Sequence, residues 1–181
     1  MLKMVSVCPS DVDEPMLRGL YTTAFPEEEQ IPYDDLKHLL QTMPIDYDAY
    51  YDGDVFVGLT IVLRRDDFNW LGYFAVVENL RGMGYGQQIL NELKRKYASG
   101  RLMLDMESPR QENCSNRKQR VRRHDFYIRN GFRDTPTLKS FKGIDYTILM
   151  LGDGEFCQRD YDGIINDLRK FWENIPAEDS K

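Results

Sequence analysis

Apolar residues along the chain follow two kinds of pattern, and each predicts one kind of element. Stretches in which apolar residues alternate with polar ones, or run together, predict strands. They are residues 2–7, 46–53, 54–65, 69–77, 101–107, 137–141 and 145–151. Stretches with apolar residues three and four positions apart predict helices. They are residues 11–25, 33–43, 85–98, 116–130 and 161–175.

Turn-forming residues separate these elements. Asp11 is the expected N-cap of the first helix, and Pro26 ends that helix. Asp52-Gly53-Asp54 lies between two apolar runs, which is a strong hairpin signal. Gly100 is a suitable residue to end the third helix, and Lys142-Gly143 predicts a turn between the last two strands.

The resulting order, β-α-α-β-β-β-α-β-α-β-β-α, combines antiparallel hairpins with a strand–helix–strand crossover. It predicts an α/β or α+β domain whose mixed sheet of six or seven strands is flanked by helices. We expect residues 1–152 to form this domain and residues 153–181 to add an amphipathic helix and a tail. The sequence leaves open whether that helix packs on the same domain or makes a homodimer. Its apolar positions are Tyr161, Ile164, Ile165, Leu168, Phe171, Trp172 and Ile175.

Composition narrows the class of protein. The 181-residue chain has a net charge of −6, which argues against nucleic acid as a partner because phosphate binding needs a basic field. No apolar run approaches the ~20 residues of a membrane span, and the first residues do not resemble a signal peptide. Cys8, Cys114 and Cys157 lie far apart, which argues against a disulfide framework or a cysteine-rich zinc site. We therefore expect a cytoplasmic protein without a membrane partner.

One basic segment runs against the acidic balance. Residues 117–123, "RKQRVRR", carry five basic side chains. Two interpretations remain open, a solvated helix face or a local site for a polyanionic ligand.

A glycine-rich segment links the strand of residues 69–77 to the helix of residues 85–98. Arg81 is followed by Gly82, Gly84 and Gly86 at every second position. A helix N-terminus offers unpaired N–H groups and a partial positive charge, and glycines allow a ligand to approach the backbone closely. The segment therefore predicts a cradle for a pyrophosphate. A Walker loop would need Gly-Lys-Ser/Thr, and the dinucleotide fingerprint needs a different glycine spacing, so ATP and NAD fit poorly.

The residues "RGMGYG", 81–86, resemble the Arg/Gln-x-x-Gly-x-Gly/Ala signature of the GNAT N-acetyltransferases. A second stretch, "FYIRNGF" at residues 126–132, is similar to the end of the fourth GNAT helix. The two motifs stand in the family's order, and the resemblance spans roughly residues 1–150. It implies the GNAT-like fold, in which acetyl-CoA lies in a splayed gap between the fourth and fifth strands.

The resemblance also implies roles for particular residues. The pantetheine of acetyl-CoA would pair with the backbone of Ala75, Val76 and Val77. Tyr127 would protonate the leaving thiolate, and a backbone N–H of the fourth strand would stabilise the oxyanion. The acetyl group would pass directly to an amine in a ternary complex, with no metal. The pyrophosphate would lie on the amides of Arg81, Gly82, Met83, Gly84, Tyr85 and Gly86.

The sequence departs from the family at two positions. Histone-type members carry a glutamate base where this chain has Trp70, so another acid must serve, and we favour Glu107 as base or substrate anchor. Many members carry a CoA-contacting asparagine seven residues before the tyrosine, and this chain has Arg120 there, with Asn116 one turn earlier. We expect both to contact acetyl-CoA, with Arg120 or Arg123 reaching its phosphates or an anionic substrate.

The acceptor is the least readable part of the sequence. In the family the first two helices and their loop shape the acceptor site, and this loop is rich in acids, including Glu28 and Glu29. We expect these two residues to bind the substrate, which favours a cationic amine of a small molecule or a peptide. Two alternatives remain, a non-catalytic acyl-CoA sensor and a protein-interaction domain.

Overall fold

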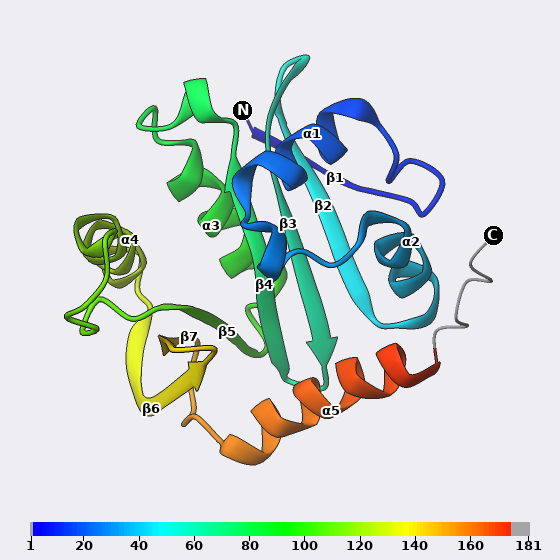
Figure 1. Ribbon diagram of the computed structural model, residues 1–181. Helices are drawn as coiled ribbons and strands as arrows, with labels where there is room; N and C mark the ends of the chain where they lie inside the picture. Colours follow the sequence, from blue (N-terminus) through cyan, green and yellow to red (C-terminus); the bar gives the residue numbers. More distant parts are fainter. Residues whose placement is uncertain (1, 175–181) are drawn as a thin grey trace.

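The computed structural model describes residues 2–174 and has the order of elements expected from the sequence (Figure 1). Seven strands form one mixed sheet in the order β1-β2-β3-β4-β5-β7-β6. The strands are β1 (Leu2–Ser6), β2 (Ile45–Asp52), β3 (Val55–Arg65), β4 (Phe68–Val76), β5 (Arg101–Glu107), β6 (Arg133–Phe141) and β7 (Ile144–Leu151). The helices are α1 (Pro15–Ala24), η1 (Glu27–Glu29), α2 (Tyr33–Thr42), η2 (Glu78–Leu80), α3 (Tyr85–Lys96), α4 (Arg117–Arg129) and α5 (Gln158–Asn174).

Both predicted hairpins are confirmed. Gly53 turns the chain between β2 and β3 with φ +59°. Lys142 and Gly143 do the same between β6 and β7 with φ +48° and +79°. In the second turn both central residues have positive φ, which gives a twist that matches that of the flanking strands.

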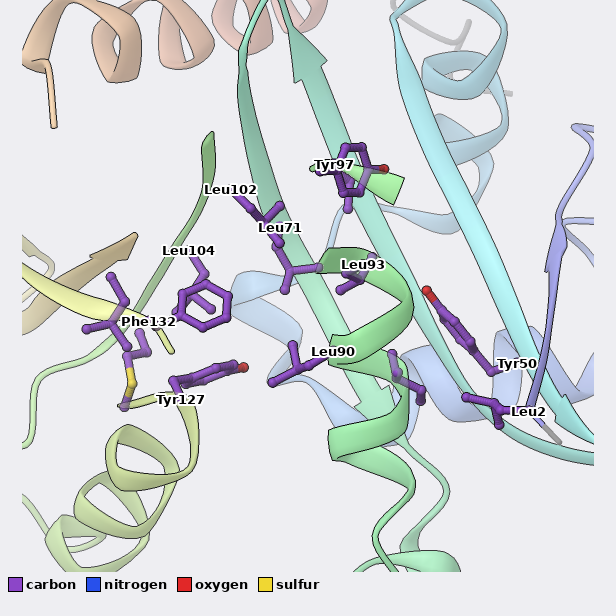
Figure 2. Close-up of a cluster of buried hydrophobic side chains, with 14 of the residues drawn as sticks. Leu2, Tyr50, Leu71, Leu90, Leu93, Tyr97, Leu102, Leu104, Tyr127 and Phe132 are labelled. Carbon is purple, nitrogen blue, oxygen red and sulfur yellow. The ribbon is translucent and has the colours of Figure 1, made fainter. Parts of the chain in front are cut away.

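Helices cover both faces of the sheet. On one face α1 and α2 pack on β2, β3 and β4, and Tyr21, Leu36 and Leu59 are completely buried or nearly so. On the other face lies α3, whose Ile89, Leu90 and Leu93 are fully buried. Figure 2 shows Leu90 and Leu93 within this cluster. Burial of each of these side chains stabilises the fold by roughly 1.5–3 kcal/mol.

The C-terminal helix packs on its own sheet. Tyr161 and Ile164 of α5 are buried against Phe68 of β4, Met103 of β5 and Met150 of β7. Figure 1 shows α5 crossing the end of the sheet at which β4 and β5 begin. Ile175, the last apolar position expected for this helix, and the tail lie outside the described residues. Within residues 2–174, no helix is both long enough and apolar enough to cross a membrane.

Several boundaries differ from the sequence prediction, and two of the differences have a clear physical reason. Helix α1 begins at Pro15, with Glu14 at the N-cap, so the expected cap at Asp11 is wrong. Proline suits the first helical position because its missing N–H would be unpaired there. Strand β6 begins at Arg133 and includes Pro136, which the prediction left out. It is an edge strand with a register shift between Asp134 and Leu138, where proline is tolerated.

Candidate active site

A gap opens between β4 and β5. The two strands are parallel and share only three residue pairs, the last of which joins Trp70 to Met103. Beyond that pair they diverge, β5 turning toward α4 (Figure 1). The indole N–H of Trp70 donates a hydrogen bond to the Asp105 carboxylate at 2.8 Å, which closes the narrow end of the gap. Gly72 is an extra residue on β4 opposite β3, and such a bulge bends the strand.

Part of the β4 backbone faces this gap. The N–H of Val77 donates to the carbonyl of Val57 at 2.9 Å, which fixes its direction toward β3. Because backbone groups alternate in direction along an antiparallel strand, Ala75 also faces β3 and Val76 faces the gap. The Val76 carbonyl accepts a hydrogen bond from Nε of Arg81 at 3.1 Å. Of the three residues expected to pair with pantetheine, the ladder therefore leaves Val76 as the one whose backbone faces the gap.

The glycine segment forms an open turn at the start of α3. Gly82 and Gly84 have φ of +81° and +87°, and a Cβ on either would meet nothing within 4 Å. Gly84 is the N-cap of α3, Met83 is exposed, and the first N–H groups of a helix have no partner within it. Gly86 is tighter, because a Cβ there would lie 3.3 Å from the Phe126 ring of α4. These glycines leave the helix N-terminus accessible, as a pyrophosphate requires. The hydroxyl of Tyr85 points elsewhere and donates to Asp52 at 2.9 Å.

Tyr127 of α4 lies in the core beside the gap. Its ring packs on those of Phe126 and Phe132, each 5.4 Å away between ring centroids. Figure 2 shows its hydroxyl directed toward Leu90 on α3, and within the described residues that hydroxyl makes no hydrogen bond. Burial raises the pKa of Tyr127 to about 12, partly opposed by the Arg123 guanidinium. The hydroxyl is therefore protonated near neutral pH and can serve as a proton donor.

Glu107 and Arg120 form a partly buried ion pair at the wide end of β5. Arg120 Nη2 contacts Glu107 Oε1 at 2.7 Å, and its Nη1 donates to Gln111 Oε1 at 2.8 Å. Asn116 accepts from Arg120 Nε at 2.7 Å and donates to Glu107 Oε2 at 3.0 Å. Both carboxylate oxygens of Glu107 are thus engaged, and the Arg120 side chain is only 5% exposed. In this structure the nearly buried Arg120 and the half-buried Asn116 are both engaged with Glu107, and their contact with acetyl-CoA stays a prediction.

Breaking this pair is expected to destabilise the protein. Arg120→Met leaves Glu107 without its cation, so we expect the free energy of unfolding to fall by about 3 kcal/mol. Urea denaturation measures it, with Arg122→Met on the exposed side of the same helix as the control. Adding Glu107→Gln to Arg120→Met should recover part of the loss, because no unpaired charge remains. Equal stability of Arg120→Met and the control would contradict this account.

Acidic and aromatic side chains gather where the loop between α1 and α2 meets β4 and β7. The hydroxyl of Tyr146 on β7 donates to the Glu29 carboxylate at 3.2 Å. The hydroxyl of Tyr73 on β4 donates to the main-chain carbonyl of Glu29 at 2.6 Å, which anchors the loop between α1 and α2. Partial burial and the carboxylates of Glu107 and Asp105 raise the pKa of Glu29, and Tyr146 and Arg123 act in the opposite direction. The side chain of Glu28 lies outside the described part of the structure.

The sequence analysis missed several residues of this region. Tyr73, Lys139, Tyr146 and Tyr161 come from four different elements, and their contacts are set by the tertiary fold. Lys139 contacts Tyr161 at 2.7 Å and Asp105 at 3.8 Å. The one available signal was strand pairing, since Tyr146 lies opposite Glu107 in the β5–β7 register. Within residues 2–174, no three His, Cys, Asp or Glu side chains gather closely enough to hold a metal ion.

Comparisons with known proteins agree with this geometry. Residues 47–134 match a family model described as an acetyltransferase (GNAT) domain, and no curated protein matches the chain significantly. A protein assigned to the GNAT family of acetyltransferases from Bacteroides thetaiotaomicron superposes with a TM-score of 0.76 at 22% identity, over 96% of this chain and 99% of its own.

Two further solved structures have named acceptors. The ribosomal-protein-S18-alanine N-acetyltransferase of Escherichia coli has a TM-score of 0.64 at 16% identity, over 87% of this chain and 97% of its own. A variant of the spermidine N-acetyltransferase of Vibrio cholerae has a TM-score of 0.61 at 11% identity, over 83% of this chain and 92% of its own. At these identities the structures share the fold of this chain.

Proposed function

The chain belongs to the GNAT superfamily of acetyltransferases, and on this basis we propose that it transfers the acetyl group of acetyl-CoA directly to a primary amine of a small molecule or peptide. The observation that carries the proposal is the gap between β4 and β5, which has the open glycine turn at one end and Tyr127 beside it. A long, narrow donor with an anionic end fits this combination.

The residues around the gap are suited to hold acetyl-CoA, the co-substrate of the family. The N-terminus of α3 and the turn from Arg81 to Gly86 would bind its pyrophosphate. The backbone of Val76, which faces the gap, would pair with the pantetheine. Acetyl-CoA supplies the acetyl group as a thioester, which is reactive toward an amine without a metal.

Two side chains are suited to the proton transfers. Glu29 would take a proton from the incoming ammonium, a role that its raised pKa and position at the acceptor side favour over Glu107. The amine nitrogen then forms a bond to the acetyl carbon and releases its second proton to solvent, and the carbon–sulfur bond breaks. Tyr127 would give its proton to the departing sulfur and regain one from solvent. The products are the amide and the free CoA thiol.

The direct test is release of CoA thiol from acetyl-CoA in the presence of primary amines. We expect release that depends on both the protein and an amine, and that rises with pH as more of the amine loses its proton. Calorimetry with acetyl-CoA alone separates the failures. Binding without release by any amine would favour an acyl-CoA sensor, and absence of binding would leave a protein-interaction domain.

A further inference from the structure

The charged groups around Glu29 are mostly neutralised by one another. Three charged side chains influence Glu29, namely Glu107, Asp105 and Arg123. Glu107 is paired with Arg120 at 2.7 Å, and Asp105 is held by Lys139 at 3.8 Å and by the indole of Trp70. Glu107 and Asp105 therefore attract a cationic ligand less strongly than unpaired carboxylates would.

Two charged side chains in this region, Glu29 and Arg123, have no oppositely charged partner among the described residues. Among the described residues, the carboxylate of Glu29 has only the neutral hydroxyl of Tyr146 as a hydrogen-bonding partner. Arg123 of α4 is half-buried, and within the described residues its guanidinium makes no hydrogen bond and no ion pair. A guanidinium without a protein partner offers several hydrogen-bond donors to a bound anion.

These two groups are separate but near each other. No ion pair within 4.0 Å joins them among the described residues, but a short series of contacts leads from one to the other. Tyr146, which donates to Glu29, lies opposite Glu107 in the sheet. Glu107 contacts Arg120, which precedes Arg123 by about one turn of α4. They come from opposite sides of the gap, Glu29 from the loop between α1 and α2, and Arg123 from α4. Arg123 precedes Tyr127 by one helical turn, so the two side chains lie on the same face of α4.

We propose that the acceptor is a zwitterion, an α-amino acid whose ammonium group lies on Glu29 and whose carboxylate lies on Arg123. The inference rests on the proposed function and specifies its substrate class. A planar guanidinium binds a carboxylate through two parallel hydrogen bonds, which orients the adjacent amine. A purely cationic amine would instead meet the positive charge of Arg123 without compensation.

The test compares amino acids with analogues that lack only the negative charge. The amino acids that occur in proteins are tested as acceptors with acetyl-CoA. Each free amino acid is compared with its α-carboxamide, which lacks the negative charge. We expect at least one amino acid to be acetylated with a kcat/KM at least about tenfold above that of its amide, since a charged hydrogen bond contributes this much.

Variants at Arg123 make the test specific. Arg123→Ala should raise KM for that amino acid at least about tenfold and leave KM for its amide nearly unchanged. Arg123→Glu should reverse the preference, so that the amide becomes the better acceptor. Arg122→Ala, an exposed arginine beside it, is the matched control. Calorimetry of the amino acid with the CoA-bound protein gives a second readout, in which binding should weaken in Arg123→Ala alone.

The outcomes separate this inference from the function it rests on. Acetyl-CoA bound by the wild type, with no amino acid preferred over its amide, would overturn the zwitterion and leave the transferase. An amino acid preference that Arg123→Ala does not reduce would also overturn it. Absence of acetyl-CoA binding would overturn the proposed function itself.

Discussion

Tyr127→Phe is expected to lower kcat about 10²–10⁴-fold, the usual contribution of a positioned acid or base. The hydroxyl is directed toward α3 beside the gap, has no partner among the described residues and has a pKa raised to about 12 by burial. It therefore keeps its proton between pH 6 and 10 and is available as a donor to the departing sulfur. Steady-state kinetics with acetyl-CoA and the best amine measures the effect.

Acetyl-CoA affinity and stability serve as controls for this variant. Removing a hydroxyl without a hydrogen-bond partner should leave the thermal midpoint nearly unchanged, and the dissociation constant of acetyl-CoA should stay within about twofold. A kcat equal to that of the wild type would mean that solvent supplies the proton. A fall in kcat that accompanies a loss of acetyl-CoA binding would assign Tyr127 to the binding surface.

Gly84→Asp is expected to weaken acetyl-CoA binding at least about 100-fold, equivalent to ~2.7 kcal/mol. The new carboxylate would extend into space that is free of protein atoms and would meet the pyrophosphate there. It would also oppose the partial positive charge of the α3 N-terminus for the ligand. Calorimetry with acetyl-CoA measures the change.

Gly53→Asp provides a matched control for the backbone strain of this substitution. Gly53 also has a positive φ and nothing within 4 Å of a Cβ, but it lies in the β2–β3 hairpin. Both variants should lose similar stability, and only Gly84→Asp should lose acetyl-CoA binding. Equal affinity in the two variants would argue that the turn binds no phosphate.

Periodicity was sufficient to predict most of the fold. The order of strands and helices follows from it because each buried face repeats every second residue or every three to four residues. The hairpin turns followed from Asp-Gly and Lys-Gly. The start of α1 was missed because Asp11 competed with Pro15, and helix starts depend on a local backbone choice that several residues can satisfy.

The candidate site was less predictable than the fold. The glycine turn and Tyr127 belong to contiguous motifs, so the sequence could identify both. The Glu107–Arg120 pair could not be read in this way, because it forms between β5 and α4 through side chains 13 residues apart. The same holds for Tyr146 and Glu29, whose contact spans 117 residues. To predict the role of a charged residue, one must know whether another residue already neutralises its charge, and this information comes from the tertiary structure.

The position of α5 has a consequence for the width of the gap. Only three residue pairs join β4 to β5. By themselves, these pairs are a weak restraint on the angle at which the strands separate. Tyr161 and Ile164 of α5 pack against residues of both strands at their paired ends. Helix α5 therefore helps to fix the angle between β4 and β5 at the point where they separate. A small change in this angle would displace the far ends of the two strands by a larger distance. A substitution that leaves a cavity beneath α5 would therefore impair the alignment of donor and acceptor, although it lies far from the residues that contact either of them.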